Sequence, residues 1–133
     1  MPCVTFKTDL FFKDIPDEQL GQWFIGGDCA AWFYVRLLPH SEITRFIDPC
    51  MEDWGWYFSV KVNGTEVSMS IWEHFEHEDS WVIEIASKKP FFRKLSYETR
   101  EYCDNLIKEL FQEILANDSR FTNIVWSEKH PNH

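Results

Sequence analysis

The dipeptide Asn63-Gly64 constrains the fold of this chain more than any other feature of the sequence. Alternating apolar and polar residues flank it in the stretch GWYFSVKVNGTEVSMSIW. Asn-Gly between two such runs is the strongest short-range signal for a β-hairpin with a two-residue type I′ turn, and the turn fixes which residues pair. The predicted pairs, moving away from the turn, are Val62 with Thr65, Lys61 with Glu66, Val60 with Val67, Phe58 with Met69, and Trp56 with Ile71.

This register gives the hairpin one apolar face and one mostly polar face, because side chains alternate along a strand. The apolar face collects Trp56, Phe58, Val60, Val62, Val67, Met69 and Ile71. The run WVIEIAS is predicted to add a third strand, with Trp81 beside Ile71, Ile83 beside Met69, Glu84 beside Ser68 and Ile85 beside Val67. Residues 72–80 are then left as a connection of nine residues, longer than the usual hairpin loop, and long loops of this kind tend to be either functional or mobile.

The other elements are predicted from periodicity and from capping residues. A strand is expected at the start of the chain, followed by a short helix over residues 14–27 that stops at Gly26-Gly27. Residues 30–38, AAWFYVRLL, are interpreted as a central strand that is apolar on both faces, and residues 41–49 as one or two turns of helix.

Ser96 is predicted to cap a long amphipathic helix, with Leu95 as a hydrophobic staple, and Asn117-Asp118 to end it before a last strand at FTNIVW. The predicted apolar stripe of this helix is Cys103, Leu106, Ile107, Leu110, Ile114 and Leu115. The sequence therefore predicts one α+β domain over residues 1–133, with residues 128–133 as a frayed tail. Its mainly antiparallel sheet, with a central three-strand meander, is expected to pack on the long C-terminal helix, beside one or two short helices.

Composition and cysteine spacing limit the classes of protein to which this chain can belong. Hydrophobic residues make up 44% of the chain and aromatic residues 17%, far from the signature of disorder. No apolar run approaches the roughly 20 residues of a membrane helix, and the start MPCVTFKTDLFFKD has charges where a signal peptide would have its apolar segment. A soluble, non-exported, cytoplasmic protein is therefore expected. Cys3, Cys29, Cys50 and Cys103 are scattered without a Cys-x-x-Cys pair, which favours reduced thiols over a zinc or redox motif.

The formal net charge is −9, and such a field repels nucleic-acid phosphates and anionic lipids. Binding to nucleic acid or to a membrane is therefore not expected, whereas a basic protein partner is. Residues 42–84 are rich in acids, with Arg45 and Lys61 as their cations, and the segment KKPFFRK from Lys88 to Lys94 reverses the sign. That segment can either bind an anion near the start of the long helix or balance the acidic surface, and the second interpretation is favoured.

The stretch WEHFEHEDSW, residues 72–81, allows three interpretations, namely a metal site, a docking surface, or only a solvated acidic loop. His74 and His77 are three residues apart among acids and can hold a divalent ion, but no third ligand or supporting shell is recognisable, so neither a metal nor a cofactor is predicted. The alternative is a docking surface, because Trp72 and Phe75 are aromatic groups beside acids and interfaces favour aromatic anchors. These two side chains can equally fold back to close the loop, and Trp81 is assigned to the core.

A second candidate segment precedes the hairpin. Glu52, Asp53 and Trp54 are expected in a turn, with Gly55 allowing the chain to bend sharply. No nucleophile elbow, P-loop or Rossmann glycine pattern is present, so no catalytic residue is predicted. The predicted partner-binding residues are Trp72, Glu73, Phe75, Glu76, Glu78, Asp79, Glu52, Asp53 and Trp54.

Three hypotheses follow for function. The leading one is a small acidic interaction protein, not an enzyme, that binds a basic protein partner in the manner of an inhibitor or immunity factor covering a cationic active site. The alternative is a small-ligand-binding domain whose pocket is lined by aromatic residues such as Trp23, Trp32, Tyr34, Trp54 and Trp126. The third is a metal-dependent enzyme that uses His74 and His77.

Overall fold

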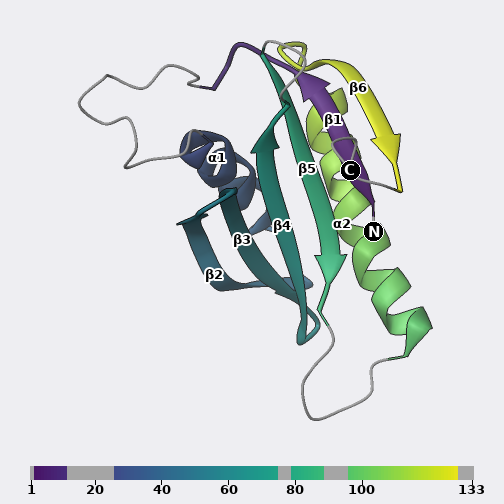
Figure 1. The fold of residues 1–133 in the computed structure, drawn as a ribbon. Helices are drawn as coiled ribbons and strands as arrows, with labels where there is room; N and C mark the ends of the chain where they lie inside the picture. The colour runs from purple at the N-terminus through teal and green to yellow at the C-terminus, as the bar shows by residue number, and fades with distance from the viewer. Residues whose placement is uncertain (1, 12–25, 75–78, 89–95, 129–133) are drawn as a thin grey trace.

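The computed structural model of the chain describes residues 2–11, 26–74, 79–88 and 96–128. A six-stranded sheet has the order β2-β3-β4-β5-β1-β6, every neighbouring pair of strands is antiparallel, and two helices lie on one side of the sheet (Figure 1). The elements in chain order are β1 Cys3–Lys7, α1 Gly27–Leu37, β2 Ile43–Glu52, β3 Gly55–Val62, β4 Thr65–Glu73, β5 Ser80–Ser87, α2 Tyr97–Ala116 and β6 Thr122–Ser127. The predicted α+β class, with an antiparallel sheet on a long C-terminal helix, is confirmed.

The β3–β4 hairpin has the predicted register. Val62 pairs with Thr65, Val60 with Val67, and each of the other predicted pairs is present as well. Asn63 and Gly64 both have positive φ, 49° and 88°, as a type I′ turn requires. A local turn signal was therefore sufficient to fix the pairing of these two strands.

The register predicted for β5 is wrong by two residues. Ile83 pairs with Ile71 and Ile85 pairs with Met69, while Glu84 pairs with Ser70 and Trp81 pairs with Glu73. Strand β4 continues to Glu73, so the connection to β5 is residues 74–79 rather than 72–80. The apolar face is nevertheless as predicted, because a shift of two residues leaves each side chain on the same side of the sheet.

The strand predicted over residues 30–38 is wrong, because residues 27–37 form helix α1. The buried side chains of α1 are Cys29, Ala30, Phe33, Tyr34 and Leu37, which recur at the spacing of one face of a helix. Val35 and Arg36 are exposed between them. The segment contains enough apolar residues to resemble a buried strand, but its exposed positions follow the helical period.

The helix predicted over residues 41–49 is also wrong, because this segment lies within strand β2 from Ile43 onward. Register shifts next to Ile47 break its pairing with β3, and Pro49 is accommodated since β2 is an edge strand. The four consecutive strands β2 to β5 are thus neighbours, so that β2 extends the run of three strands predicted from the sequence.

Three further predictions can be compared only in part. Most of the helix predicted over residues 14–27 lies outside the described residues, although Gly26 and Gly27, expected to stop it, instead lead into α1. The proposed staple residue Leu95 is not among the described residues either. Of the tail predicted over residues 128–133, the structure describes Glu128 alone.

Helix α2 begins and ends where the sequence predicted. The Ser96 hydroxyl oxygen accepts a hydrogen bond from the Thr99 backbone N–H at 3.1 Å, and Asn117 is the C-cap. The fully buried line along the helix is Cys103, Ile107, Phe111 and Leu115. Leu106, Leu110 and Ile114, predicted in the same stripe, are only partly buried, and Phe111 was missed.

One hydrophobic core joins α1, α2 and a single face of the sheet. Phe58, Val60, Val67, Met69, Ile83 and Ile85, all predicted core residues, have no exposed surface. Neither α1 nor α2 packs on the opposite face of the sheet, which carries Tyr57 and Lys61 of β3 and Trp72 of β4. Because neither helix covers this second face, it is the face of the sheet on which a partner protein could bind.

The four thiols should differ in reactivity, and this can be tested directly. Cys3, Cys29 and Cys103 are buried, whereas Cys50 is half-buried. Burial raises the pKa of Cys3 to about 12 and raises the pKa of Cys29 and of Cys103 above the ordinary value. Because the thiolate is the reactive species, we expect a thiol reagent at neutral pH to label Cys50 first in the folded protein.

Mass spectrometry after timed alkylation would identify the labelled cysteine. Alkylation in denaturant, on protein purified with its thiols protected, should then modify all four cysteines. Two or fewer free thiols under those conditions would contradict the reduced state expected from the sequence.

Candidate interaction surface

The sheet brings the two candidate partner-binding segments to the same end of the molecule. Glu52 pairs with Gly55, so Asp53 and Trp54 form the turn between β2 and β3. Because β3 and β4 are antiparallel and Trp56 pairs with Ile71, the start of β3 lies beside the end of β4, where Trp72 and Glu73 are located. Segments about 20 residues apart in the sequence are therefore neighbours.

Three aromatic rings gather at this end of the sheet. The Trp54 and Trp72 ring centroids are 5.1 Å apart at an interplanar angle of 35°, and the Trp54 and Tyr57 centroids are 6.4 Å apart. Trp54 is 40% exposed, and the other two side chains are half-buried. We call this group, with its flanking acids, the turn-end patch, and it comprises Glu52, Asp53, Trp54, Tyr57, Trp72 and Glu73.

Gly55 makes this arrangement possible. A Cβ atom at position 55 would lie 2.5 Å from the backbone oxygen of Ile71, closer than any real side chain tolerates, and the φ of Gly55 is 156°. Only glycine therefore allows β3 to start directly against the end of β4. The sharp bend predicted at Gly55 is thus present, and next to it the Trp54 ring packs against Trp72.

The electrostatic environment of the turn-end patch is negative. Glu52 and Asp53 are exposed and Glu73 is half-buried. A hydrogen bond with the Cys50 side chain, burial, and the charges of Cys50, Glu52 and Glu66 raise the pKa of Tyr57 to about 12. The Tyr57 phenol therefore remains neutral at physiological pH, and the charge of the patch comes from its carboxylates.

A cation of the chain already binds next to this surface. The Lys88 ammonium lies 3.6 Å from a carboxylate oxygen of Glu66 and 5.9 Å from the centroid of the Tyr57 ring. This is the first residue of the basic segment noted in the sequence, and residues 89–95, which include the rest of that segment, are outside the described residues. The contact shows that a carboxylate and an aromatic ring on this face can hold one positive charge together.

The connection between β4 and β5 is described only at its two ends. The His74 backbone N–H donates to the Ser80 carbonyl at 2.9 Å, and the Asp79 carbonyl accepts from the Thr8 N–H at 2.8 Å. Phe75, Glu76 and Glu78, which were predicted to bind a partner, and His77, the second candidate metal ligand, are not among the described residues. Within residues 2–11, 26–74, 79–88 and 96–128, no three potential ligands are grouped to hold a metal ion, and the His74 and His77 hypothesis stays untested.

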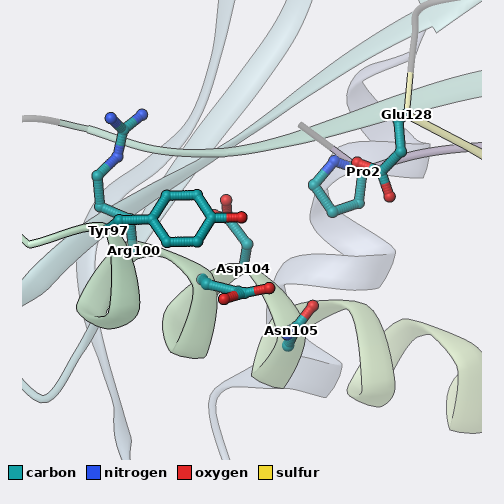
Figure 2. A pocket seen from close by; sticks show the side chains of 7 residues that line it. Pro2, Tyr97, Arg100, Asp104, Asn105 and Glu128 are labelled. Carbon is teal, nitrogen blue, oxygen red and sulfur yellow. The ribbon is translucent and has the colours of Figure 1, made fainter.

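Two cavities lie away from the turn-end patch. One of about 350 Å³ lies at the start of α2 and is lined by Pro2, Tyr97, Arg100, Glu101, Asp104, Asn105 and Glu128 (Figure 2). The Asp104 carboxylate accepts a hydrogen bond from the Ser87 backbone N–H at 2.9 Å, and burial raises the pKa of Asp104. In Figure 2 the Arg100 guanidinium points away from Asp104 and Glu128, and its Nε lies 3.4 Å from the Ser87 hydroxyl.

The second cavity, of about 270 Å³, is lined by Val62, Asn63, Thr65, Glu98, Thr99, Tyr102 and Cys103. Neither cavity is lined by Trp32, Tyr34, Trp54 or Trp126, four of the residues proposed for an aromatic ligand pocket. Trp23, the fifth, is outside the described residues. Tyr34 is instead buried in the core, and Trp32 and Trp126 pack against the core.

Of the nine predicted partner-binding residues, five are thus assembled in one surface: Glu52, Asp53, Trp54, Trp72 and Glu73. Tyr57 belongs to the same surface and was not predicted. Its signal was present in the sequence, because Tyr57 and Trp72 alternate with core residues on their strands and must therefore share the other face of the sheet.

No family model, curated protein or solved structure matches this chain. None of the helices in the described ranges combines the length and the apolar character that crossing a membrane requires.

Proposed function

We propose that this protein is an acidic interaction protein that binds a basic surface of a partner protein through the turn-end patch, in the manner of an inhibitor or immunity factor. The observation that carries the proposal is the convergence of two separate acidic and aromatic segments, residues 52–54 and 72–73, on one exposed surface. Interfaces commonly combine aromatic anchors with complementary charge at the rim. The patch has both components.

Charge and aromatic contact act at different stages of such binding. The net charge of −9 attracts a basic partner over a distance and raises the association rate, an effect that salt screens. Contact of the partner with Trp54 and its neighbours removes apolar surface from water and slows dissociation. An inhibitor of a cationic active site needs both a fast encounter and a long-lived complex.

The proposal predicts that neutralising the patch weakens partner binding much more than neutralising acids elsewhere. The triple variant Glu52→Gln/Asp53→Asn/Glu73→Gln should reduce the association rate about tenfold at low ionic strength and flatten its dependence on salt. Its unfolding free energy should change little, because Glu52 and Asp53 are exposed, Glu73 is only half-buried, and substitutions at the surface usually contribute within about 0.5 kcal/mol each.

A matched control removes the same number of charges from the exposed side of α2, as Glu101→Gln/Glu109→Gln/Glu113→Gln. The measurement is affinity capture from host extract with the wild-type protein, followed by kinetic binding of the captured partner to all three proteins. Equal association rates for the two triple variants, or capture of an acidic partner only, would contradict the proposal.

A further inference from the structure

The partly exposed ring of Trp54 is the feature of the turn-end patch that indicates which chemical group of a partner could bind there. The ring packs at a tilt of 35° against Trp72, and its centroid lies 6.4 Å from that of Tyr57, yet 40% of the residue remains exposed. It is held in a two-residue turn between paired strands, so its position is fixed before any partner arrives. A fixed, partly exposed indole loses little conformational freedom when a partner binds it.

Elsewhere on this protein, aromatic rings at the surface are covered by cations of the same chain. The Arg36 guanidinium carbon lies 3.5 Å from the centroid of the Trp32 ring, and the Lys61 ammonium lies 4.3 Å from that of Phe46. Lys108 lies 5.6 Å from the Trp126 centroid. All three distances lie within the range of cation–π interactions, so three aromatic side chains of this protein each have a cation of the same chain next to the ring.

A second recurring arrangement combines an aromatic ring with a carboxylate around one cation. Arg45 donates to the Asp48 carboxylate at 2.9 Å while its guanidinium carbon lies 5.9 Å from the Tyr34 ring centroid. Lys88 lies in a looser arrangement of the same kind, with its ammonium 3.6 Å from a Glu66 carboxylate oxygen and 5.9 Å from the Tyr57 ring centroid. In both sites a carboxylate neutralises the cation while a tyrosine ring lies close to it, and Arg45 also donates to the Tyr34 hydroxyl through Nε at 3.4 Å.

Trp54 has carboxylates beside it in the chain, since Glu52 at the end of β2 and Asp53 in the turn directly precede it and both are exposed. The acidic surroundings favour a cation that comes from outside the chain. A guanidinium fits better than an ammonium, because it is planar and weakly hydrated and can stack on an indole while its edge donates to carboxylates.

We propose that the turn-end patch binds an arginine side chain of its partner, stacked on Trp54 and hydrogen-bonded by Glu52 and Asp53. This inference rests on the proposed function and specifies the chemistry of its contact. Arginine is also the charged residue most enriched in interface cores, which suits a partner whose cationic site must be covered.

The test uses three synthetic peptides that differ only in their basic positions, which hold arginine, lysine or the neutral arginine isostere citrulline. Their binding is followed by NMR through the indole N–H signal of Trp54, identified by its loss in Trp54→Phe. The arginine peptide should shift this signal saturably and bind at least threefold more tightly than the lysine peptide. The citrulline peptide should leave the signal unshifted at the same concentrations.

For the variants of Trp54, which lack the indole signal, binding is measured by calorimetric titration of the arginine peptide. Trp54→Leu should weaken this binding about fivefold, in keeping with a cation–π contact at an exposed site. Trp54→Phe should retain part of the affinity. Tyr97→Leu, which removes an aromatic residue that is 74% exposed at the start of α2, should leave it unchanged. Thermal unfolding of each variant checks that the fold is intact.

Equal binding of the citrulline peptide, tighter binding of the lysine peptide, or full affinity in Trp54→Leu would overturn the arginine assignment. The captured partner separates this failure from failure of the proposed function. If the Glu52, Asp53 and Glu73 variant loses the partner but Trp54→Leu keeps it, docking through the patch stands and the arginine assignment fails. If the arginine peptide binds at Trp54 but the partner binds all variants equally, the arginine site stands and the proposed function fails.

Discussion

Val60→Asp is expected to leave the protein unfolded at room temperature. Val60 has no exposed surface and lies between Val67 of β4 and Arg45 of β2 in the sheet, with its side chain in the core. A carboxylate at this position has no partner and costs several kcal/mol to bury, against a total stability of about 5 to 15 kcal/mol for a domain of this kind. Circular dichroism and a urea titration would measure the loss of structure.

Thr44→Asp is the matched control for this substitution. Thr44 is an exposed residue of the neighbouring strand β2 and pairs with Lys61, so the new carboxylate is solvated and faces a cation. It should leave the midpoint of urea unfolding nearly unchanged. A folded Val60→Asp protein with wild-type stability would mean that this side chain does not face the core.

Phe33→Ala is expected to lower the unfolding free energy by about 3 to 5 kcal/mol, the range for removing a large aromatic side chain from a core. Phe33 has no exposed surface, and its ring centroid lies 4.9 Å from that of Trp32, 5.0 Å from Phe111 and 5.7 Å from Phe6. The residue joins α1, α2 and β1, so its removal leaves a cavity that no single element can close. Urea unfolding followed by circular dichroism would give the difference in free energy.

Val35→Ala gives the comparison that identifies the secondary structure of this segment. Val35 is 54% exposed on α1, so its truncation should change the unfolding free energy by less than about 0.5 kcal/mol. In a strand, residues 33 and 35 would share one face and their truncations would have similar effects. Similar large losses for both variants would therefore contradict the helix.

Part of the candidate surface could be predicted from the residue types in the sequence alone. Composition and charge predicted an acidic, aromatic docking surface, and Trp54 and Trp72 were each predicted to bind a partner as members of two separate segments. Nothing in the sequence indicated that these two residues stack, because their contact depends on the register of β3 against β4 and on the close approach that Gly55 allows. The role of Tyr57 followed only once both strands had been assigned to their faces.

Local interactions determined the elements that could be predicted from the sequence. The type I′ turn at Asn63-Gly64 fixed its own hairpin, and the Ser96 cap with the Asn117 end fixed α2, because each of these signals acts within a few residues. Tertiary packing decided the elements that were predicted wrongly. Residues 30–37 are a short apolar segment whose pattern suits either a helix or a strand, and packing against the core selects the helix. Residues 43–49 are mostly exposed and lie in a strand because they pair with β3.

The two-residue error in the β5 register has the same origin. Alternation specifies which face of a strand is buried but leaves shifts of two residues equivalent, so the pairing was settled by the length of the connection and by the neighbouring strand β1. The sequence by itself thus determined the α+β class, the central hairpin, the long helix and the acidic charge. Only the tertiary structure placed Glu52, Asp53 and Trp54 beside Trp72 and Glu73, because contacts between distant segments depend on the packing of the whole sheet.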